Sequence, residues 1–288
     1  MKVFRCRRSE KTLSYAILNG ELYKLDYDAL DALLDYKRLR RISGDPVKAD
    51  PDAFLRSPEK FGCVLAKPID PPEVWGTGIT YYIARRRYSD EASVARIGEL
   101  TIYDAVYDAK RPEVFFKGTG NRCVGPNEPV AVRGDSEWTH PEPELALVLS
   151  SSGEILGFTI ADDVTAGDIE SENPLYLPQA KIYRGSCAIG PVIVTPDEVP
   201  DPYNLTITLR MLRQGKVLFE GSNSTKNLKR KFEEMIEYLL RYNPIPDGTV
   251  YMTGAAVVPG KEYPMLHGDV IEITIDRIGT LVTPVVKL

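Results

Sequence analysis

The sequence predicts an α+β fold that is mostly β, and three observations carry this prediction. Many short apolar runs of strand-like composition follow one another along the 288 residues. Only a few segments have the apolar spacing of a helix. Strands and helices also do not alternate with the rhythm of βαβ units, which argues against a parallel α/β sheet. We therefore expect short strands with a helix or two packed on them.

Composition and charge exclude several classes of protein. A hydrophobic content of 43% and a charged content of 27% are the ordinary balance of a globular domain. A net charge of −5 provides no basic field for nucleic acid. No apolar run approaches the ~20 residues that span a bilayer, so we expect no membrane partner. The charged opening, MKVFRCRRSEKT, lacks the apolar centre of a signal peptide, which favours a cytoplasmic protein.

Cysteine and histidine usage limits the possible chemistry. The two histidines, His140 and His267, are too few for a histidine-rich metal site and leave little material for a Ser-His-Asp triad. Without a C-x-x-C pair, a structural zinc site is not expected, and the wide spacing of the cysteines predicts reduced thiols. The four cysteines are Cys6, Cys63, Cys123 and Cys187.

Residues 1–70 are predicted to form a small N-terminal α+β domain. Two strands, 14–18 and 21–25, flank Asn19-Gly20, the preferred dipeptide of a type I′ hairpin turn. Asp26 is expected to cap a helix that carries leucines at roughly helical spacing. A connector rich in Pro and Asp, with one short helix, then leads to Pro72. We expect this domain to act as a lid or packing module without chemistry of its own.

Residues 71–288 are predicted to form the second, larger domain. Residues 74–82 read as a strand that runs into a Gly-rich bend, and 82–95 as an exposed helical segment. Residues 226–242 carry the apolar stripe of a packed helix. Further strands are expected at 114–117, 130–132, 145–149, 188–194, 205–211, 216–220, 250–252, 270–275 and 280–286.

An acidic hairpin at 140–164 is the candidate functional element. Glu142 and Glu144 are two residues apart, so on a strand they project from one face. A turn at 151–153 returns the chain and brings Asp162 or Asp163 toward them. Carboxylates gathered in this way repel one another, and Mg²⁺ or Mn²⁺ with oxygen ligands relieves the repulsion. The alternative is a pair of solvated glutamates on an edge strand, which the E-x-E pattern alone leaves open.

Several motifs around this hairpin occur in the order typical of one enzyme family. They are Glu142 and Glu144 with Asp163 of Asp162-Asp163-Val164, Lys181 ahead of Cys187 and Gly190-Pro191, Thr253-Gly254-Ala255, and Gly268-Asp269-Val270-Ile271-Glu272. With these motifs the chain resembles the fumarylacetoacetate hydrolase family from about Pro72 to Val285. The resemblance implies a mixed β-sandwich or roll behind a small N-terminal domain. It also implies Glu142, Glu144 and Asp163 as metal ligands.

The sequence segments GTGITY, RPEVFFKGTGNRCVGP and PEPELALVL resemble those of the sugar-acid dehydratase branch of the family. This implies a Mg²⁺- or Mn²⁺-dependent lyase that converts 2-keto-3-deoxy-D-arabinonate to 2,5-dioxopentanoate and water in oxidative pentose breakdown. The family's hydrolases use a His-Glu pair, and the corresponding segment, 81–95, has no His. A C–C hydrolase or decarboxylase of acylpyruvates, and a non-enzymatic binder of sugar acids or metal, are the alternatives. Relatives assemble as homodimers or homotetramers, which implies the same here.

The remaining site residues follow from the resemblance and from the chemistry of the side chains. Lys181 is expected either to pair with the substrate carboxylate or enolate oxygen, or to act as the base. Thr253 and Arg85 are expected to bind the substrate, although a solvated helix face is the alternative for Arg85. The candidates for acid–base catalysis are Glu113, Glu170 and Glu172, among which the sequence does not choose.

Overall fold

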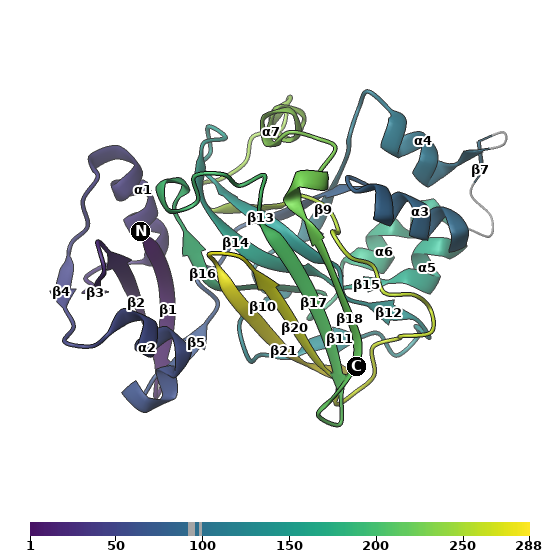
Figure 1. Cartoon of the computed structure of the whole chain (residues 1–288). Helices are drawn as coiled ribbons and strands as arrows, with labels where there is room; N and C mark the ends of the chain where they lie inside the picture. Colours follow the sequence, from purple (N-terminus) through teal and green to yellow (C-terminus); the bar gives the residue numbers. More distant parts are fainter. Residues whose placement is uncertain (92–95, 98–99) are drawn as a thin grey trace.

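A long mixed sheet runs through the molecule (Figure 1). The computed structural model describes residues 1–91, 96–97 and 100–288, and within them this sheet has 12 strands. Along its main path the order is β4 (Gly44–Pro46), β3 (Glu21–Leu25), β2 (Lys11–Leu18), β1 (Lys2–Arg8), β16 (Cys187–Val194), β14 (Ile155–Asp163), β13 (Pro143–Leu149), β19 (Thr249–Met252), β6 (Val74–Gly78) and β9 (Glu113–Gly118). Beside this path, β5 (Val64–Ala66) pairs with β1 and β10 (Cys123–Val124) with β16.

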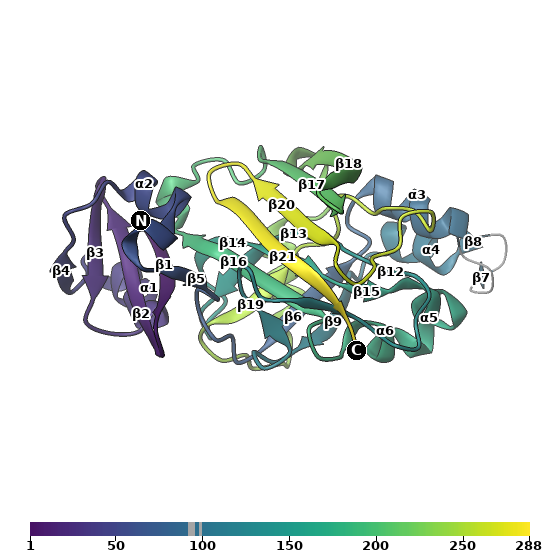
Figure 2. The same cartoon turned by 90° about the horizontal axis from the view of Figure 1, so that it is seen from below.

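A second sheet lies across the middle of the long one (Figure 2). Its order is β11 (Val130–Val132), β21 (Gly279–Lys287), β20 (Val270–Ile275), β17 (Thr206–Arg213) and β18 (Lys216–Ser224). The alternating Ile271, Ile273 and Ile275 are buried in the core that both sheets share. The predicted mostly β, α+β fold is therefore confirmed. The remaining described strands form two two-stranded sheets. One pairs β12 (Thr139–His140) with β15 (Thr165–Ala166), and the other pairs β7 (Arg96–Ile97) with β8 (Leu100–Thr101).

Strand β13 is buried on both of its faces. Leu145, Leu147 and Leu149 belong to the core shared with the second sheet, whereas Ala146 and Val148 face a second apolar cluster. Helix α1 (Ala29–Leu39) contributes to that second cluster. A central strand enclosed in this way needs an uninterrupted apolar sequence, and ELALVL supplies it. The hairpin that carries the acidic residues is consequently fixed from both sides.

Four helices gather at the end of the molecule remote from the N-terminal strands (Figures 1 and 2). They are α3 (Tyr82–Glu91), α4 (Ile102–Asp108), α5 (Gly167–Glu172) and α6 (Leu177–Lys181). No helix in the described ranges combines the length and the apolar character needed to cross a membrane. The other helical elements are α2 (Pro51–Arg56), α7 (Phe232–Leu240), and the 3-10 turns η1 (Pro58–Phe61), η2 (Pro174–Tyr176), η3 (Pro196–Glu198) and η4 (Thr225–Asn227).

Helix α7 begins later than the apolar periodicity predicts. The expected start was residue 226, but the helix starts at Phe232. The reason is a tertiary contact: Leu228 forms a β-bridge with Tyr81, and the Lys229 backbone N–H donates to the Thr80 carbonyl. These bonds hold Leu228 in extended backbone between the 3-10 turn η4 and α7, which overrides the helical propensity of the segment.

The helix predicted after Asp26 also differs from expectation at its start. Asp28, not Asp26, caps α1, and its side chain accepts a hydrogen bond from the Leu30 N–H. The Asp26 carboxylate instead accepts from the Ser43 hydroxyl. The helix expected at 82–95 is present over Tyr82–Glu91, and residues 92–95 of this prediction lie outside the described ranges.

The N-terminal strands continue the sheet of the larger part of the chain. Strand β1 pairs with β16 through Lys2 opposite Val194 and Val3 opposite Ile193. The Pro-rich segment 68–72 separates β5 from β6, near the predicted boundary at residue 70. The division into domains 1–70 and 71–288 stays a prediction, and the sheet crosses it.

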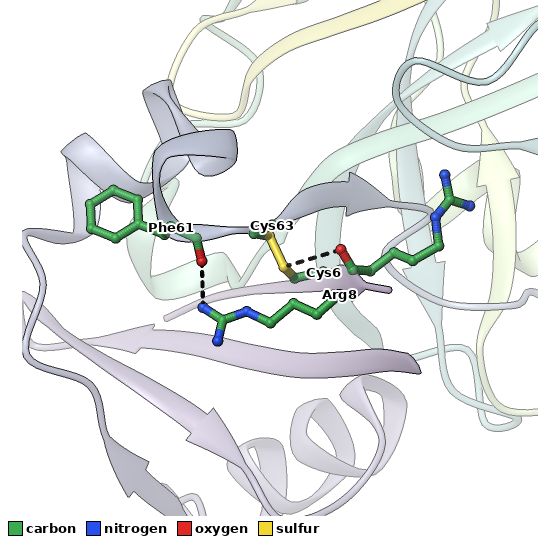
Figure 3. The surroundings of a disulfide bond; sticks show 5 residues. Cys6, Arg8, Phe61 and Cys63 are labelled. Atoms are coloured by element: carbon green, nitrogen blue, oxygen red, sulfur yellow. Dashed lines mark hydrogen bonds between the residues drawn. A yellow bond between two sulfur atoms is a disulfide. The ribbon is translucent and has the colours of Figure 1, made fainter. Parts of the chain in front are cut away.

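Two cysteines that the sequence separates widely are joined in the structure. Cys6 on β1 and Cys63 form a disulfide with a Cα–Cα distance of 5.5 Å (Figure 3). Antiparallel pairing of β1 with β5 places Cys6 opposite Leu65, which brings Cys63 within reach. The prediction of four reduced thiols is therefore wrong for this pair, because sequence spacing does not report cross-strand proximity. Cys123 and Cys187 are free and lie opposite each other on β10 and β16.

The disulfide predicts a thiol count. Protein denatured without reductant is expected to show two reactive thiols, and protein reduced beforehand is expected to show four, by titration with a chromogenic disulfide reagent. Closing a loop of 57 residues is expected to stabilise the fold by roughly 4 kcal/mol, which Cys6→Ser removes in denaturant unfolding. Four thiols without reductant would contradict the bond.

Candidate active site

The β13–β14 hairpin brings three carboxylates together. The Asp163 N–H donates to the Glu142 carbonyl at 3.0 Å, so the end of β14 lies opposite the start of β13. One carboxylate oxygen from each of Glu142, Glu144 and Asp163 lies within 4.8 Å of the others. All three side chains are buried. The structure thus assembles the three residues that the sequence pattern selects as metal ligands.

Asp162 faces away from this group. Its Oδ1 accepts a hydrogen bond from the Glu142 N–H at 2.9 Å, which fixes the strand that carries Glu142. Burial raises the pKa of Asp162 to about 7. Its role in the structure is to hold the hairpin, and the second of the two aspartates is the one that joins the glutamates.

A glycine loop after β19 holds Glu144. The Gly254 N–H donates to Glu144 Oε2 at 2.5 Å. Gly254 has φ +106°, and a Cβ there would collide with Thr80 Oγ1, so no other residue fits. The Thr253 hydroxyl donates to the Leu145 carbonyl at 2.8 Å and ties this loop to β13. Thr253 therefore supports the loop and does not line the cavity described below.

Two buried lysines contact the carboxylates. Lys181 Nζ on α6 donates to Glu142 Oε2 and Asp163 Oδ2, both at 2.9 Å, and to the Thr165 hydroxyl at 2.7 Å. Burial alone lowers the pKa of Lys181, but the charges of Asp163, Glu142 and Glu170 outweigh it and the pKa is raised well above its usual value. Lys181 is accordingly an ammonium here, and the depressed pKa that a base needs is not found.

Lys117, at the end of β9, is the second lysine. Its Nζ lies 2.5 Å from Asp163 Oδ1 and donates to the Val164 carbonyl at 2.9 Å. Lys117 is not among the site residues that the sequence predicts, although its place directly after the apolar run VFF is a signal of burial. Burial tends to raise the pKa of Asp163, but the nearby charges of Lys117 and Lys181 outweigh burial and lower it.

A cavity opens beside the carboxylates. The three predicted metal ligands and Lys181 line one side of it. Two more acids, Glu113 and Glu170, also line it. The rest of the wall is mainly apolar and consists of Thr77, Gly78, Ile79, Ala84, Phe115, Leu177 and Ala255. Neither His140 nor His267 is among the lining residues.

Glu113 and Glu170 approach the cavity from different elements. Glu113 on β9 lies opposite Gly78 on β6, and a Cβ on Gly78 would come within 1.9 Å of its carboxylate. The missing side chain of Gly78 therefore makes room for Glu113. Burial raises the pKa of Glu113, and burial raises that of Glu170 on α5 to about 8. Glu172, the third acid–base candidate, is exposed on the same helix and does not line the cavity.

Arg85 and the two histidines are not among the residues that line the cavity. Arg85 Nε donates to Asp104 Oδ1 at 2.8 Å and its guanidinium lies over the Tyr107 ring, so it ties α3 to α4. His140 is buried with Nδ1 3.8 Å from Glu142 Oε1, and burial lowers its pKa to about 4. His267 is exposed. The structure thus places Arg85 and Thr253, both predicted to bind substrate, outside the cavity wall.

Tyr103 of α4 is a further residue that the sequence analysis missed. Its side chain is buried, and burial together with the charges of Glu170 and Glu113 raises its pKa. Tyr103 is not among the residues that line the cavity, so the charges of the two acids act on its phenol from beyond the cavity wall. Nothing in the local sequence, TIYDAVYD, distinguishes Tyr103 from Tyr107, because only the packing of α4 tells the two apart.

The donor set fits a small, hard divalent cation. Burial and the charges of Asp163 and Glu142 raise the pKa of Glu144 well above its usual value, which records mutual repulsion among the carboxylates. A cation bound to the three oxygens removes that repulsion. Oxygen-only ligands from three carboxylates are typical of Mg²⁺ and Mn²⁺ sites that leave positions for water and substrate.

Comparison with known proteins places this site in context. A family model described as fumarylacetoacetate (FAA) hydrolase, C-terminal, matches residues 88–286, more than half of the chain. A 2-dehydro-3-deoxy-D-arabinonate dehydratase of Saccharolobus solfataricus is 56% identical over all of this chain and 97% of its own length. A probable 2-keto-3-deoxyxylonate dehydratase of Haloferax volcanii is 44% identical over 74% of this chain and 72% of its own.

Solved structures show the same relationship. A 2-keto-3-deoxy-D-arabinonate dehydratase complexed with magnesium and 2,5-dioxopentanoate superposes with a TM-score of 0.92 and 54% identity, over 100% of this chain and 99% of that one. A 5-carboxymethyl-2-hydroxymuconate delta-isomerase from Mycobacterium smegmatis has a TM-score of 0.70 at 22% identity, over 100% of this chain and 99% of that one. The second likeness shows a shared fold alone.

The position of Glu170 predicts a pH-dependent stability. With a folded pKa of about 8 against a usual 4.5, folded protein keeps the proton that unfolded protein has lost, so stability falls as pH rises from about 4.5 to about 8. Glu170→Gln lacks this effect. We expect the metal-stripped variant to gain thermal stability over wild type as pH rises, with no further gain above about pH 8.

Glu172→Gln is the matched control for this prediction. It changes the same chemical group on the same helix, but at an exposed position. Its melting temperature should follow that of wild type from pH 5 to pH 9, a range chosen to bracket both pKa values. Parallel curves for wild type and Glu170→Gln would contradict the raised pKa.

Proposed function

Because the chain belongs to the fumarylacetoacetate hydrolase family, we propose that it is a magnesium-dependent hydro-lyase that removes water from 2-keto-3-deoxy-D-arabinonate to give 2,5-dioxopentanoate. The observation that carries this proposal is a cavity lined by three ligand carboxylates, Lys181 and two further acids, but by neither histidine. The full-length identity of 56% to a dehydratase supports the same reaction. Its physiological place would be the oxidative breakdown of pentoses.

Glu142, Glu144 and Asp163 would hold the metal. One carboxylate oxygen from each lies within 4.8 Å of the other two, and the three carboxylates occupy a buried site. Magnesium, when bound, would act as a Lewis acid toward the 2-keto group and make the C3 protons easier to remove. Mn²⁺ has the same ligand preference and is expected to substitute. A magnesium complex of a relative with 54% identity supports the choice of Mg²⁺.

Lys181 would bind the anionic end of the substrate. It lines the cavity as an ammonium next to the ligand carboxylates, where it can pair with the substrate carboxylate or with the enolate oxygen. Phe115 lies under it, with Nζ 5.4 Å from the ring centroid. Thr253 and Arg85 would then contribute to binding indirectly, through the glycine loop and through the α3–α4 contact respectively.

Glu113 and Glu170 would carry the proton transfers. One takes a C3 proton, and the other protonates the C4 hydroxyl, which leaves as water. A shift of the new double bond toward C5 moves a C5 proton to C3, and the resulting enol becomes the aldehyde by moving its hydroxyl proton to C4. A pKa of about 8 suits Glu170 to the acid role near neutral pH. Glu113 would then be the base.

The position of the histidines favours dehydration over hydrolysis of an acylpyruvate. Water activation by a His-Glu pair needs a histidine at the cavity, and neither His140 nor His267 lines it. The low pKa of His140, about 4, also reflects complete burial away from bulk water. Hydrolysis and decarboxylation of an acylpyruvate are therefore less well supported than the elimination of water from a 2-keto-3-deoxy sugar acid. We also propose that the protein is a homodimer or homotetramer, because members of the family usually assemble in this way. The proposed substrate is intracellular, so we propose a cytoplasmic location.

Substrate specificity provides the first test of the proposed function. Purified protein with Mg²⁺ is expected to convert 2-keto-3-deoxy-D-arabinonate to 2,5-dioxopentanoate, followed by mass spectrometry or by an aldehyde-specific assay, and to leave an acylpyruvate intact. Cleavage of the acylpyruvate alone would support the hydrolase alternative. Absence of turnover with both compounds would support a binding protein.

The metal ligands provide a second, independent test. Glu144→Gln keeps the size of the side chain but removes the charge, so kcat with Mg²⁺ is expected to fall by about 100-fold or more. Glu154→Gln is the matched control, because Glu154 is exposed in the turn of the same hairpin. Near-wild-type activity of Glu144→Gln at ordinary Mg²⁺ concentrations would remove Glu144 from the ligand set.

A further inference from the structure

Lys117 is a charged residue in the interior for which the proposed reaction has no use. Its side chain is 0% exposed, and it is not among the residues that line the cavity. Lys181, by contrast, lines the cavity and can reach a substrate. Burial of an ammonium costs several kcal/mol unless it is paired. The role of Lys117 must therefore lie in the groups that its Nζ contacts.

Those contacts all lie at the end of the β13–β14 hairpin. Nζ is 2.5 Å from Asp163 Oδ1 and donates to the Val164 carbonyl at 2.9 Å. Val164 follows Asp163 directly, so the lysine holds both the backbone and one carboxylate oxygen of this corner. The other oxygen, Oδ2, faces Lys181 on the cavity side. Asp163 is thus held with its two oxygens in different environments.

We propose that Lys117 is a positioning residue that sets the metal selectivity of the site. Lys117, which is fully buried and does not line the cavity, holds Oδ1 in the interior. Oδ2 faces the cavity beside Lys181, whose ammonium divides its hydrogen bonds among three acceptors, so Asp163 offers Oδ2 as its single ligand oxygen. Mg²⁺ and Mn²⁺ accept single oxygens in an octahedral arrangement. Ca²⁺ takes six to eight oxygens and commonly uses both oxygens of a carboxylate. Lys117 consequently favours the smaller ions. This inference rests on the proposed metal centre.

The discriminating measurement is a ratio of affinities. Removal of a positive charge strengthens the attraction of every divalent cation, so absolute affinity does not report selectivity. The ratio of Ca²⁺ to Mg²⁺ affinity cancels that effect. It reports whether Asp163 can offer its second carboxylate oxygen to the larger cation. Calorimetric titration of metal-stripped protein with MgCl₂ and with CaCl₂ gives both constants without any measurement of turnover.

Lys117→Met keeps the length of the side chain and removes its charge. We expect it to raise the ratio of Ca²⁺ to Mg²⁺ affinity by about tenfold, the lower range for the loss of a group that orients a metal ligand. Lys117→Gln, which retains a donor for the Val164 carbonyl, is the second variant in case the first does not fold. Lys67→Met is the matched control, because Lys67 Nζ donates to the carbonyls of Gly120 and Cys123 and touches no metal ligand.

The outcomes separate this inference from the proposed function. A raised ratio in either Lys117 variant, with an unchanged ratio in Lys67→Met, supports selectivity by Lys117. An unchanged ratio in the Lys117 variants overturns it while the metal centre stands. Failure of both variants to fold even with Mg²⁺ also overturns it, in favour of a purely structural lysine. If wild-type protein binds neither ion, the metal centre itself fails and the inference falls with it.

Discussion

Repulsion among buried carboxylates is the constraint on which the site depends. Glu142, Glu144 and Asp163 are each almost inaccessible to solvent, so their charges are poorly screened by water. The fold offsets this cost with two ammonium groups and one backbone N–H, from Lys117, Lys181 and Gly254. The long sheet with both faces covered makes this possible, because a rigid hairpin keeps the acids in place. A looser scaffold would let them separate.

Much of the fold could be read from the sequence because local patterns decide it. The apolar run of β13, the turn at 151–153 and the alternation in β20 each follow from neighbouring residues. What escaped prediction depends on contacts between distant segments. The start of α7 is set by the bridge between Tyr81 and Leu228, and the Cys6–Cys63 bond by the pairing of β1 with β5. No window of sequence contains both partners.

The same division applies to the site. The E-x-E spacing and the aspartate after a hairpin lie within one supersecondary unit, so the proximity of Glu142, Glu144 and Asp163 was predictable. The choice between Glu170 and Glu172 was not, because both lie on α5 and only its packing shows which one lines the cavity. Lys117 was missed for a related reason: the β6–β9 pairing that buries it joins segments about forty residues apart.

The origin of each side chain suggests how one scaffold serves several reactions. The carboxylates come from the β13–β14 hairpin, which both sheets and α1 enclose, whereas Glu170 and Tyr103 come from the helices at one end of the molecule. Changes in those helices can alter proton transfer and substrate fit while the carboxylate group stays intact. Metal binding would then belong to the geometry of the sheet, and the choice of reaction to the helices at its end.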